Sequence, residues 1–176
     1  MPNTAPYGSW RSPITSDLIV AQITMLSDVR IDGDGVYWLE GRPQEQGRSA
    51  VVRASPDGTA VDITPHGFNV RTRVHEYGGG SWSLASGTCI FSNFEDQRLY
   101  GQRTDGAAPE PLTPEPPNPK HHWRYSDGVL DSVRHRWVGV REDHTSGGEP
   151  VNTIVAIDLD RPGASPGGVL VEGHFL

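Results

Sequence analysis

The chain lacks the signals that would assign it to a membrane, a nucleic acid or an oxidising compartment. It has a single cysteine, Cys89, so it cannot form an internal disulfide, and the apolar neighbours Ile90 and Phe91 predict a buried, inert thiol. Basic residues number 15 against 22 acidic ones, and the net charge of −7 argues against a nucleic-acid partner. The longest apolar run near the start, 18–21, is too short for a signal peptide or a membrane span, so the expected location is cytoplasmic, without a membrane partner.

Glycine and proline are abundant, with 21 and 15 residues, and most of them lie between short apolar runs. This pattern predicts many short strands joined by turns. The strands recur in a regular order, and the Asp-Gly turns at 56–58 and 104–106 lie 48 positions apart. A unit of four short strands with a period of this size is typical of a β-propeller blade.

The predicted fold class is therefore all-β, with about three four-stranded blades of an incomplete β-propeller. The blades are expected at about 29–65, 74–114 and 124–173, after an N-terminal segment at 1–28. Their inner strands are expected at 23–31, 78–84 and 125–130. The run 78–80 of three glycines suits an inner strand, where neighbouring backbones crowd together, although a flexible loop is the alternative.

A short N-terminal helix over 14–21 is also predicted, because Ser12 suits the N-cap and Pro13 the first helical position. A strand is the alternative, since isoleucine and valine favour strands as well. Closed propellers have about four to eight blades, so three blades indicate a fragment. Its open blade edges would allow self-association.

Propeller topology places alternate loops on opposite edges of the blades. One edge receives short turns, and the other receives longer loops at 41–48, 66–76, 92–97, 115–124 and 141–152, which are rich in charged and aromatic residues. Long and varied loops on a rigid scaffold commonly carry binding sites. The alternative is that these loops simply bear solvated charge.

The segment 71–77 is the densest in such residues and leads into an inner strand, so its end is expected to face the central channel. Arginine can pair with a carboxylate and glutamate with an amine, and a peptide has both groups. The structural alternative is that these charges pair with one another. The candidate substrate-binding residues are Glu76, Arg73, His75, Tyr77, Asn93 and Arg141.

Motifs for catalysis and metal binding are not supported. The string 163–167 matches the nucleophile pattern G-x-S-x-G, but Pro166 lacks the backbone N–H that an oxyanion hole needs, and the strand-like 169–171 follows in place of a helix. His121 and His122 are adjacent and would point in opposite directions in a strand. No catalytic residue, metal or cofactor is therefore expected in this chain.

Several stretches together resemble the N-terminal propeller of bacterial serine peptidases in the prolyl oligopeptidase family. The most similar branch comprises dipeptidyl aminopeptidases and acylaminoacyl peptidases, including puromycin-hydrolysing aminopeptidases. The resemblance covers nearly the whole chain. It is carried by residues 7–15, 34–43, 69–80, 91–100 and 140–144.

The resemblance implies a two-domain enzyme in which the propeller restricts entry to a C-terminal α/β-hydrolase domain with a Ser-Asp-His triad. Its substrates would be small peptides or aminoacyl amides. The hydrolase domain and its triad are absent from this chain, which is expected to gate substrates without being catalytic by itself. In some relatives a propeller glutamate holds the free amine of the substrate, a role that the resemblance suggests for Glu76. The rival hypothesis is a non-enzymatic binding module that closes by oligomerisation.

Overall fold

The computed structural model describes residues 4–9, 11–20, 23–118 and 122–173, which form three four-stranded antiparallel sheets. Each sheet is a meander in which consecutive strands pair, as the tight turns between short apolar runs predict. The sheets comprise β1 (Met25–Asp32), β2 (Gly35–Arg42), β3 (Arg48–Ala54) and β4 (Ala60–Asp62); β5 (Trp82–Ala85), β6 (Thr88–Ser92), β7 (Leu99–Arg103) and β8 (Glu110–Pro111); and β9 (Trp123–Asp131), β10 (Arg136–Asp143), β11 (Val151–Asp158) and β12 (Gly168–Glu172).

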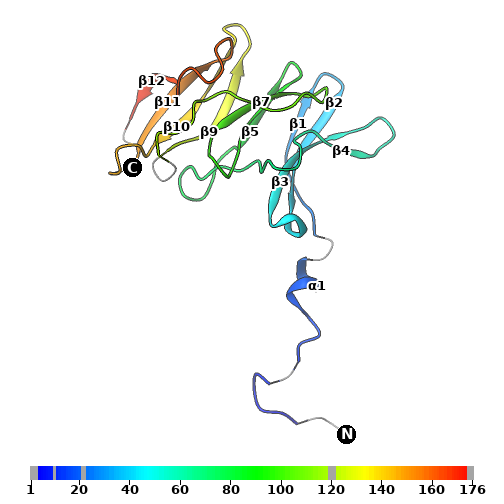
Figure 1. Cartoon of the computed structure of the whole chain (residues 1–176). Coiled ribbons are helices and arrows are strands. Elements are labelled where there is room, and N and C mark those ends of the chain that lie inside the picture. Colours follow the sequence, from blue (N-terminus) through cyan, green and yellow to red (C-terminus); the bar gives the residue numbers. More distant parts are fainter. Residues whose placement is uncertain (1–3, 10, 21–22, 119–121, 174–176) are drawn as a thin grey trace.

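The three sheets lie side by side in chain order, as blades do in a propeller (Figure 1). The first strand of the middle blade, β5, contacts β1 on one side and β9 on the other, so the first strand of each blade is the inner one. This arrangement confirms the prediction of an all-β, incomplete propeller.

The core lies between the blades, and the middle blade contributes to both halves of it. In β6, Cys89 and Phe91 pack toward the first blade, whereas Ile90 between them packs toward the third. Successive strand residues point to opposite faces, and both faces of this sheet are covered, so β6 is apolar at each of these positions. Burial raises the pKa of the Cys89 thiol to about 12, as expected for an inert core cysteine.

The prediction that the run 78–80 forms part of an inner strand is wrong, because β5 begins only at Trp82. Gly78 has a φ of 89°, whereas residues in regular β-strands have negative φ values. The close approach expected of these glycines does occur, but with the next inner strand. A β-carbon on Gly79 would lie 2.6 Å from Asp127 Oδ2, and the Gly80 N–H donates to Asp127 Oδ1 at 2.8 Å.

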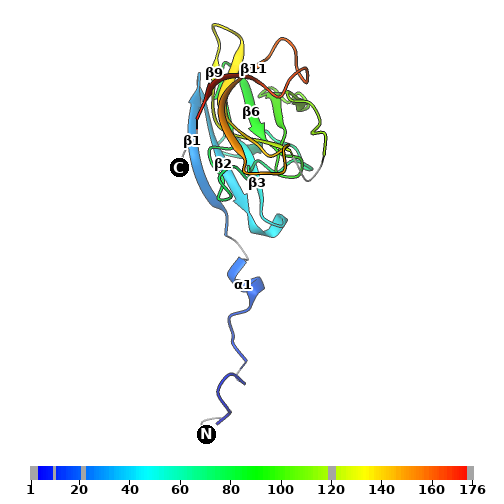
Figure 2. The same cartoon turned by 90° about the vertical axis from the view of Figure 1, so that its left-hand side faces the viewer.

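The predicted N-terminal helix is present, but it is shorter than expected. The α-helix α1 spans Ser16–Val20, and Ala21 lies outside the described residues. Thr15 caps it in place of Ser12, since Thr15 Oγ1 accepts the Leu18 N–H at 3.1 Å. In both Figure 1 and Figure 2, α1 lies away from the sheets. Within the described residues, no helix is long and apolar enough to cross a membrane.

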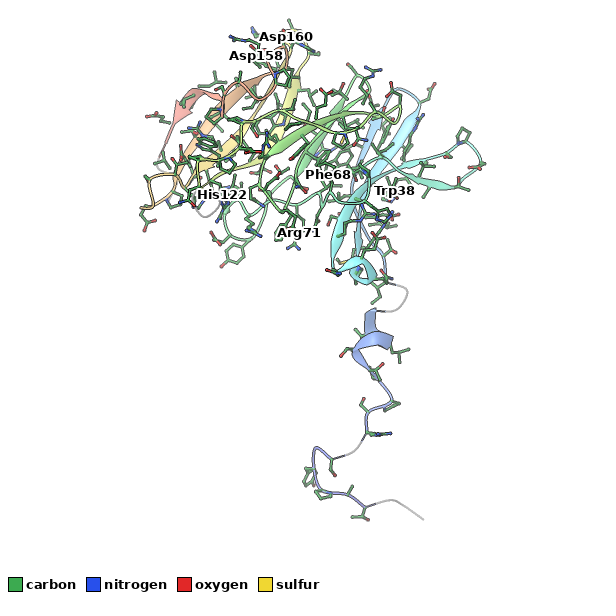
Figure 3. The ribbon with its side chains drawn as sticks, in the orientation of Figure 1. Trp38, Phe68, Arg71, His122, Asp158 and Asp160 are labelled. Carbon is green, nitrogen blue, oxygen red and sulfur yellow. The ribbon has the colours of Figure 1, made fainter. Side chains whose placement is uncertain are left out.

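The connections separate onto two edges of the blades (Figure 3). Asp158, the last residue of β11, and Asp160 shortly after it lie on the upper edge, where the short turns between β1 and β2 and between β5 and β6 also belong by topology. Arg71 and His122 lie on the lower edge, which we call the loop face. It carries the connections 43–47, 63–81, 93–98, 112–118 and 144–150.

Candidate functional site

The most unusual backbone on the loop face is the turn 73–78, which connects the first blade to the second. His75 and Glu76 are consecutive residues with φ values of 57° and 60°, a left-handed conformation that is uncommon outside glycine. The Gly78 N–H closes the turn by donating to the Val74 carbonyl oxygen at 2.9 Å. Backbone of this kind persists only where the surroundings enforce it, and it is concentrated at binding sites.

Two residues of the third blade enforce this turn. Glu142 on β10 is buried, and its Oε1 accepts the His75 backbone N–H at 2.7 Å. The Glu142 carboxylate also lies 3.1 Å from His144 Nε2 and 3.7 Å from Arg124 Nη1. Arg124 on β9 donates from Nη1 to the Arg73 carbonyl oxygen at 2.9 Å and to Glu76 Oε1 at 2.8 Å. A buried carboxylate and a partly buried guanidinium therefore hold the turn from one side.

A hollow of about 570 Å³ lies beside the turn. The Glu76 side chain is 74% exposed and Tyr77 is 99% exposed, so both are available to a ligand or a partner. A fully exposed tyrosine presents an apolar ring together with a polar tip, a combination common at interaction surfaces. The hollow is lined by Leu39, Val70–Arg73, Glu76–Gly79, Ser81 and Phe94.

The charge of Glu76 is stabilised by its neighbours. The hydrogen bond from Arg124 holds the pKa of the Glu76 carboxyl below its ordinary value, with a smaller contribution from the positive charge of Arg73. Glu76 is therefore a carboxylate at neutral pH and remains one under mildly acidic conditions. It can accept hydrogen bonds from an ammonium group with the oxygen that Arg124 leaves free.

Two arginines that line the hollow share one aromatic ring. The guanidinium carbons of Arg71 and Arg73 lie 4.7 and 4.3 Å from the centroid of the Phe94 ring. Gln97 fixes this arrangement, because its Oε1 accepts the Arg73 N–H and its Nε2 donates to the Phe94 carbonyl oxygen, both at 2.8 Å.

The structure brings four of the six predicted site residues together. Glu76, Arg73 and Tyr77 line the hollow, and His75 lies in the same turn with its side chain half exposed. Asn93 has a structural position. Its side chain is buried, its Oδ1 accepts the Asn69 N–H, and its Nδ2 donates to Asp96. These two bonds pin two loops together, and Asn93 does not line the hollow.

Arg141 also lies away from the hollow. Its side chain is buried, and Nη1 approaches the carbonyl oxygens of Pro166 and Gly167 at 3.5 and 3.3 Å. Residues in adjacent positions of a strand point to opposite faces, so Glu142 reaches the turn and Arg141 does not. Sequence reasoning missed the contributions of Arg124, Glu142, Phe94 and Gln97, although the segments that it singled out, 92–97, 115–124 and 141–152, contain all four. The structure places Arg124 on β9 and Glu142 on β10.

The string 163–167 lies in the loop between β11 and β12, with no helix after it, and Ser165 Oγ accepts the Gly167 N–H at 3.0 Å. His121 lies outside the described residues. Among the residues that the structure describes, no three histidine, cysteine or acidic side chains are grouped closely enough to hold a metal ion.

Solved structures of peptidases are similar to this chain. A Mycobacterium tuberculosis puromycin-hydrolyzing peptidase matches 99% of it, with 36% identity and a TM-score of 0.79. A puromycin hydrolase matches 94% of it, with 33% identity and a TM-score of 0.74, and a mutant of puromycin hydrolase complexed with PGG gives 33% identity over 93%, with a TM-score of 0.73. The chain spans only 28%, 26% and 26% of these proteins. No protein-family model and no curated protein matches the chain.

Proposed function

Because this chain corresponds to the β-propeller portion of peptidases in the prolyl oligopeptidase family, we propose that it filters and orients small peptides or aminoacyl amides for a serine hydrolase domain. One observation carries the proposal. The loop face has a hollow of about 570 Å³ in which Glu76 presents an exposed carboxylate from a turn that is held in place by another blade.

In this proposal the catalytic serine, its base and the oxyanion hole belong to a separate α/β-hydrolase domain of the same protein, which we propose to be cytoplasmic. The propeller contributes by limiting the size of what enters and by fixing one end of the substrate. Binding energy from a group remote from the scissile bond orients that bond for attack. Glu76 would provide this energy by accepting hydrogen bonds from the free amine of a peptide.

The reading frame beyond Leu176 provides the decisive experiment. We expect the native gene to encode further blades and then a strand, a G-x-S-x-G turn and a helix, and we expect its full product to react with a fluorophosphonate probe. The 176-residue chain should remain unlabelled at Ser165, because Pro166 cannot contribute an oxyanion-hole N–H. A gene product that ends at Leu176 and does not label would refute the peptidase proposal.

The Glu76→Gln variant of the complete enzyme tests the amine anchor. The substitution removes the charge of the side chain and keeps its shape. KM for peptides with a free amine is therefore expected to rise roughly tenfold, because about one charge-assisted hydrogen bond is lost. Peptides with an acetylated amine should show no change. Glu149→Gln, at an exposed glutamate in the connection between β10 and β11, is the matched control. Equal changes for free and acetylated peptides would exclude Glu76 as the anchor.

A second candidate function is supported by the two open sides of the blade stack. Val29 and Ile31 on β1 are 67% and 74% exposed, and Val129 on β9 is 62% exposed. Asp28 lies at a β-bulge of β1 and has a φ of 51°. Asp127 lies at the corresponding bulge of β9 and has a φ of 52°. Since Asp127 binds the Gly80 N–H of the preceding blade, Asp28 could bind a preceding blade supplied by another copy.

This second function is a non-enzymatic binding module whose copies associate blade to blade. It requires that the native product end near Leu176, that it not react with the fluorophosphonate probe, and that its sedimentation coefficient rise with concentration. The labelling experiment therefore separates the two candidates, because only a serine hydrolase reacts with the probe.

A further inference from the structure

Arg71 and Arg73 differ from most arginines of the described part of the chain, because neither forms an ion pair with a described carboxylate. Among the described residues, neither guanidinium lies within ion-pair distance of a carboxylate, and both lie over the Phe94 ring. Other arginines pair closely with acids, as Arg42 does with Asp62 and Arg136 with Asp131. In a chain of net charge −7, two cations that share one ring and form no ion pair with a described acid are an unusual arrangement.

The protein places these two positive charges beside one ring through its backbone. The Arg71 N–H donates to the Ser92 carbonyl oxygen at 3.1 Å, and the Arg73 N–H donates to the buried Gln97 side chain. Like charges that share one ring repel each other, and this repulsion is relieved when an anion binds between or beside them. The arrangement is therefore organised before any ligand arrives.

The geometry leaves the donors of both guanidinium groups available. A guanidinium that stacks on a ring uses its face, whereas its N–H groups point outward from its edge. An edge of this kind matches the two oxygens of a carboxylate in a bidentate pair. Arg71 is exposed and Arg73 half-buried, and both line the same hollow as Phe94 and Glu76.

The hollow is thus lined by charges of both signs. Glu76, which pairs with Arg124, provides a negative charge, and Arg71 and Arg73 on Phe94 provide positive charges. A short peptide with free ends carries a positive amine and a negative carboxylate. The charges of both signs in the hollow are complementary to those two ends.

We propose that Arg71, Arg73 and Phe94 form a carboxylate-binding site that takes the C-terminal carboxylate of a short peptide. The identification of the ligand as a peptide rests on the proposed function, whereas the binding of a carboxylate does not. The site makes the propeller selective for short peptides with a free carboxyl end over their amides.

The test is calorimetric titration of the 176-residue chain with N-acetyl-triglycine and with its C-terminal amide. The acid is expected to bind roughly tenfold or more tightly than the amide, as the loss of a charge-assisted pair predicts. Acetylation removes the amine that Glu76 would hold, so this comparison tests only the binding of the carboxylate by the arginines. Failure of the amine anchor therefore leaves this result unchanged, and the two proposals fail separately.

Substitutions assign the effect to these residues. Arg71→Gln and Arg73→Gln are each expected to weaken binding of the acid about tenfold, and the double variant should bind acid and amide equally. Arg53→Gln is the matched control, since Arg53 also stacks on a ring, that of Tyr37 at 5.7 Å, but lies outside the hollow. Equal binding of acid and amide by the unsubstituted chain, or full binding by the double variant, would overturn the proposal.

A third ligand distinguishes the source of the carboxylate. The amide of N-acetyl-Gly-Glu-Gly carries its only carboxylate on a side chain. Binding at least tenfold weaker than that of N-acetyl-triglycine is expected, because the C-terminal group is then missing. Equal binding would overturn the assignment to the peptide terminus, and tighter binding of inorganic phosphate than of either acid would overturn the assignment to a carboxylate.

Discussion

The Gly128→Ala variant is expected to lose about 3 kcal/mol of unfolding free energy, since its new side chain overlaps a packed indole. A β-carbon at Gly128 would lie 1.9 Å from Cε2 and 2.0 Å from Nε1 of Trp137. Trp137 is 2% exposed in the core between the second and third blades. The indole cannot move toward Gly139 either, where a β-carbon would already lie 2.4 Å from its ring.

Chemical denaturation followed by tryptophan fluorescence and by far-ultraviolet circular dichroism measures this loss. The matched control is Gly148→Ala, because a β-carbon there would meet only Ser146 Oγ, at 3.9 Å. Its unfolding free energy should stay within about 0.5 kcal/mol of the unsubstituted chain. A Gly128→Ala variant as stable as that control would mean that Trp137 does not pack against β9 in solution.

Replacing Glu142 with alanine is expected to cost about 3 kcal/mol of stability, because it removes the anion that three neighbours share. The His75 N–H would lose its acceptor, and the half-enclosed Arg124 guanidinium would lose a buried counter-charge at 3.7 Å. The left-handed residues of the turn 73–78 would then relax. Affinity for peptides with a free amine should fall to the extent that we expect for Glu76→Gln, although Glu142 itself does not line the hollow.

Two further variants separate positioning of the turn from general destabilisation. Glu142→Gln keeps an acceptor for the His75 N–H, so it should retain most of the stability and recover part of the amine-dependent affinity. Glu110→Ala removes an exposed carboxylate from β8 and should change neither quantity. If Glu142→Ala weakens binding of acetylated and free peptides to the same extent, Glu142 supports the fold and does not position the anchor.

The strands could be predicted from the sequence because their information is local. A strand such as β6 requires only apolar residues at successive positions and a turn at each end, and the period of the Asp-Gly turns then groups the strands into blades. The glycines at 78–80 show the limit of this reasoning. Their spacing indicated a crowded backbone, but the crowding partner is Asp127, nearly fifty positions away on another blade.

The candidate site could likewise be predicted from the sequence only in part. The charged turn at 73–77 could be identified as a candidate from its composition, and Glu76, Arg73 and Tyr77 do line one hollow. Composition could not choose between Arg141 and Glu142, since neighbours on a strand face opposite ways and a shift of one residue exchanges them.

The sequence by itself determined the propeller class, the repeat and the loops that carry charge, because each depends on neighbours along the chain. Only the tertiary structure decided which of those charges meet. The Glu142 carboxylate reaches the His75 N–H across 67 positions of sequence, and Arg124 reaches Glu76 across 48. Such pairs depend on how the blades pack against one another, and the distance between two blades is set by side chains such as Trp137 and Phe91 that lie elsewhere in the chain.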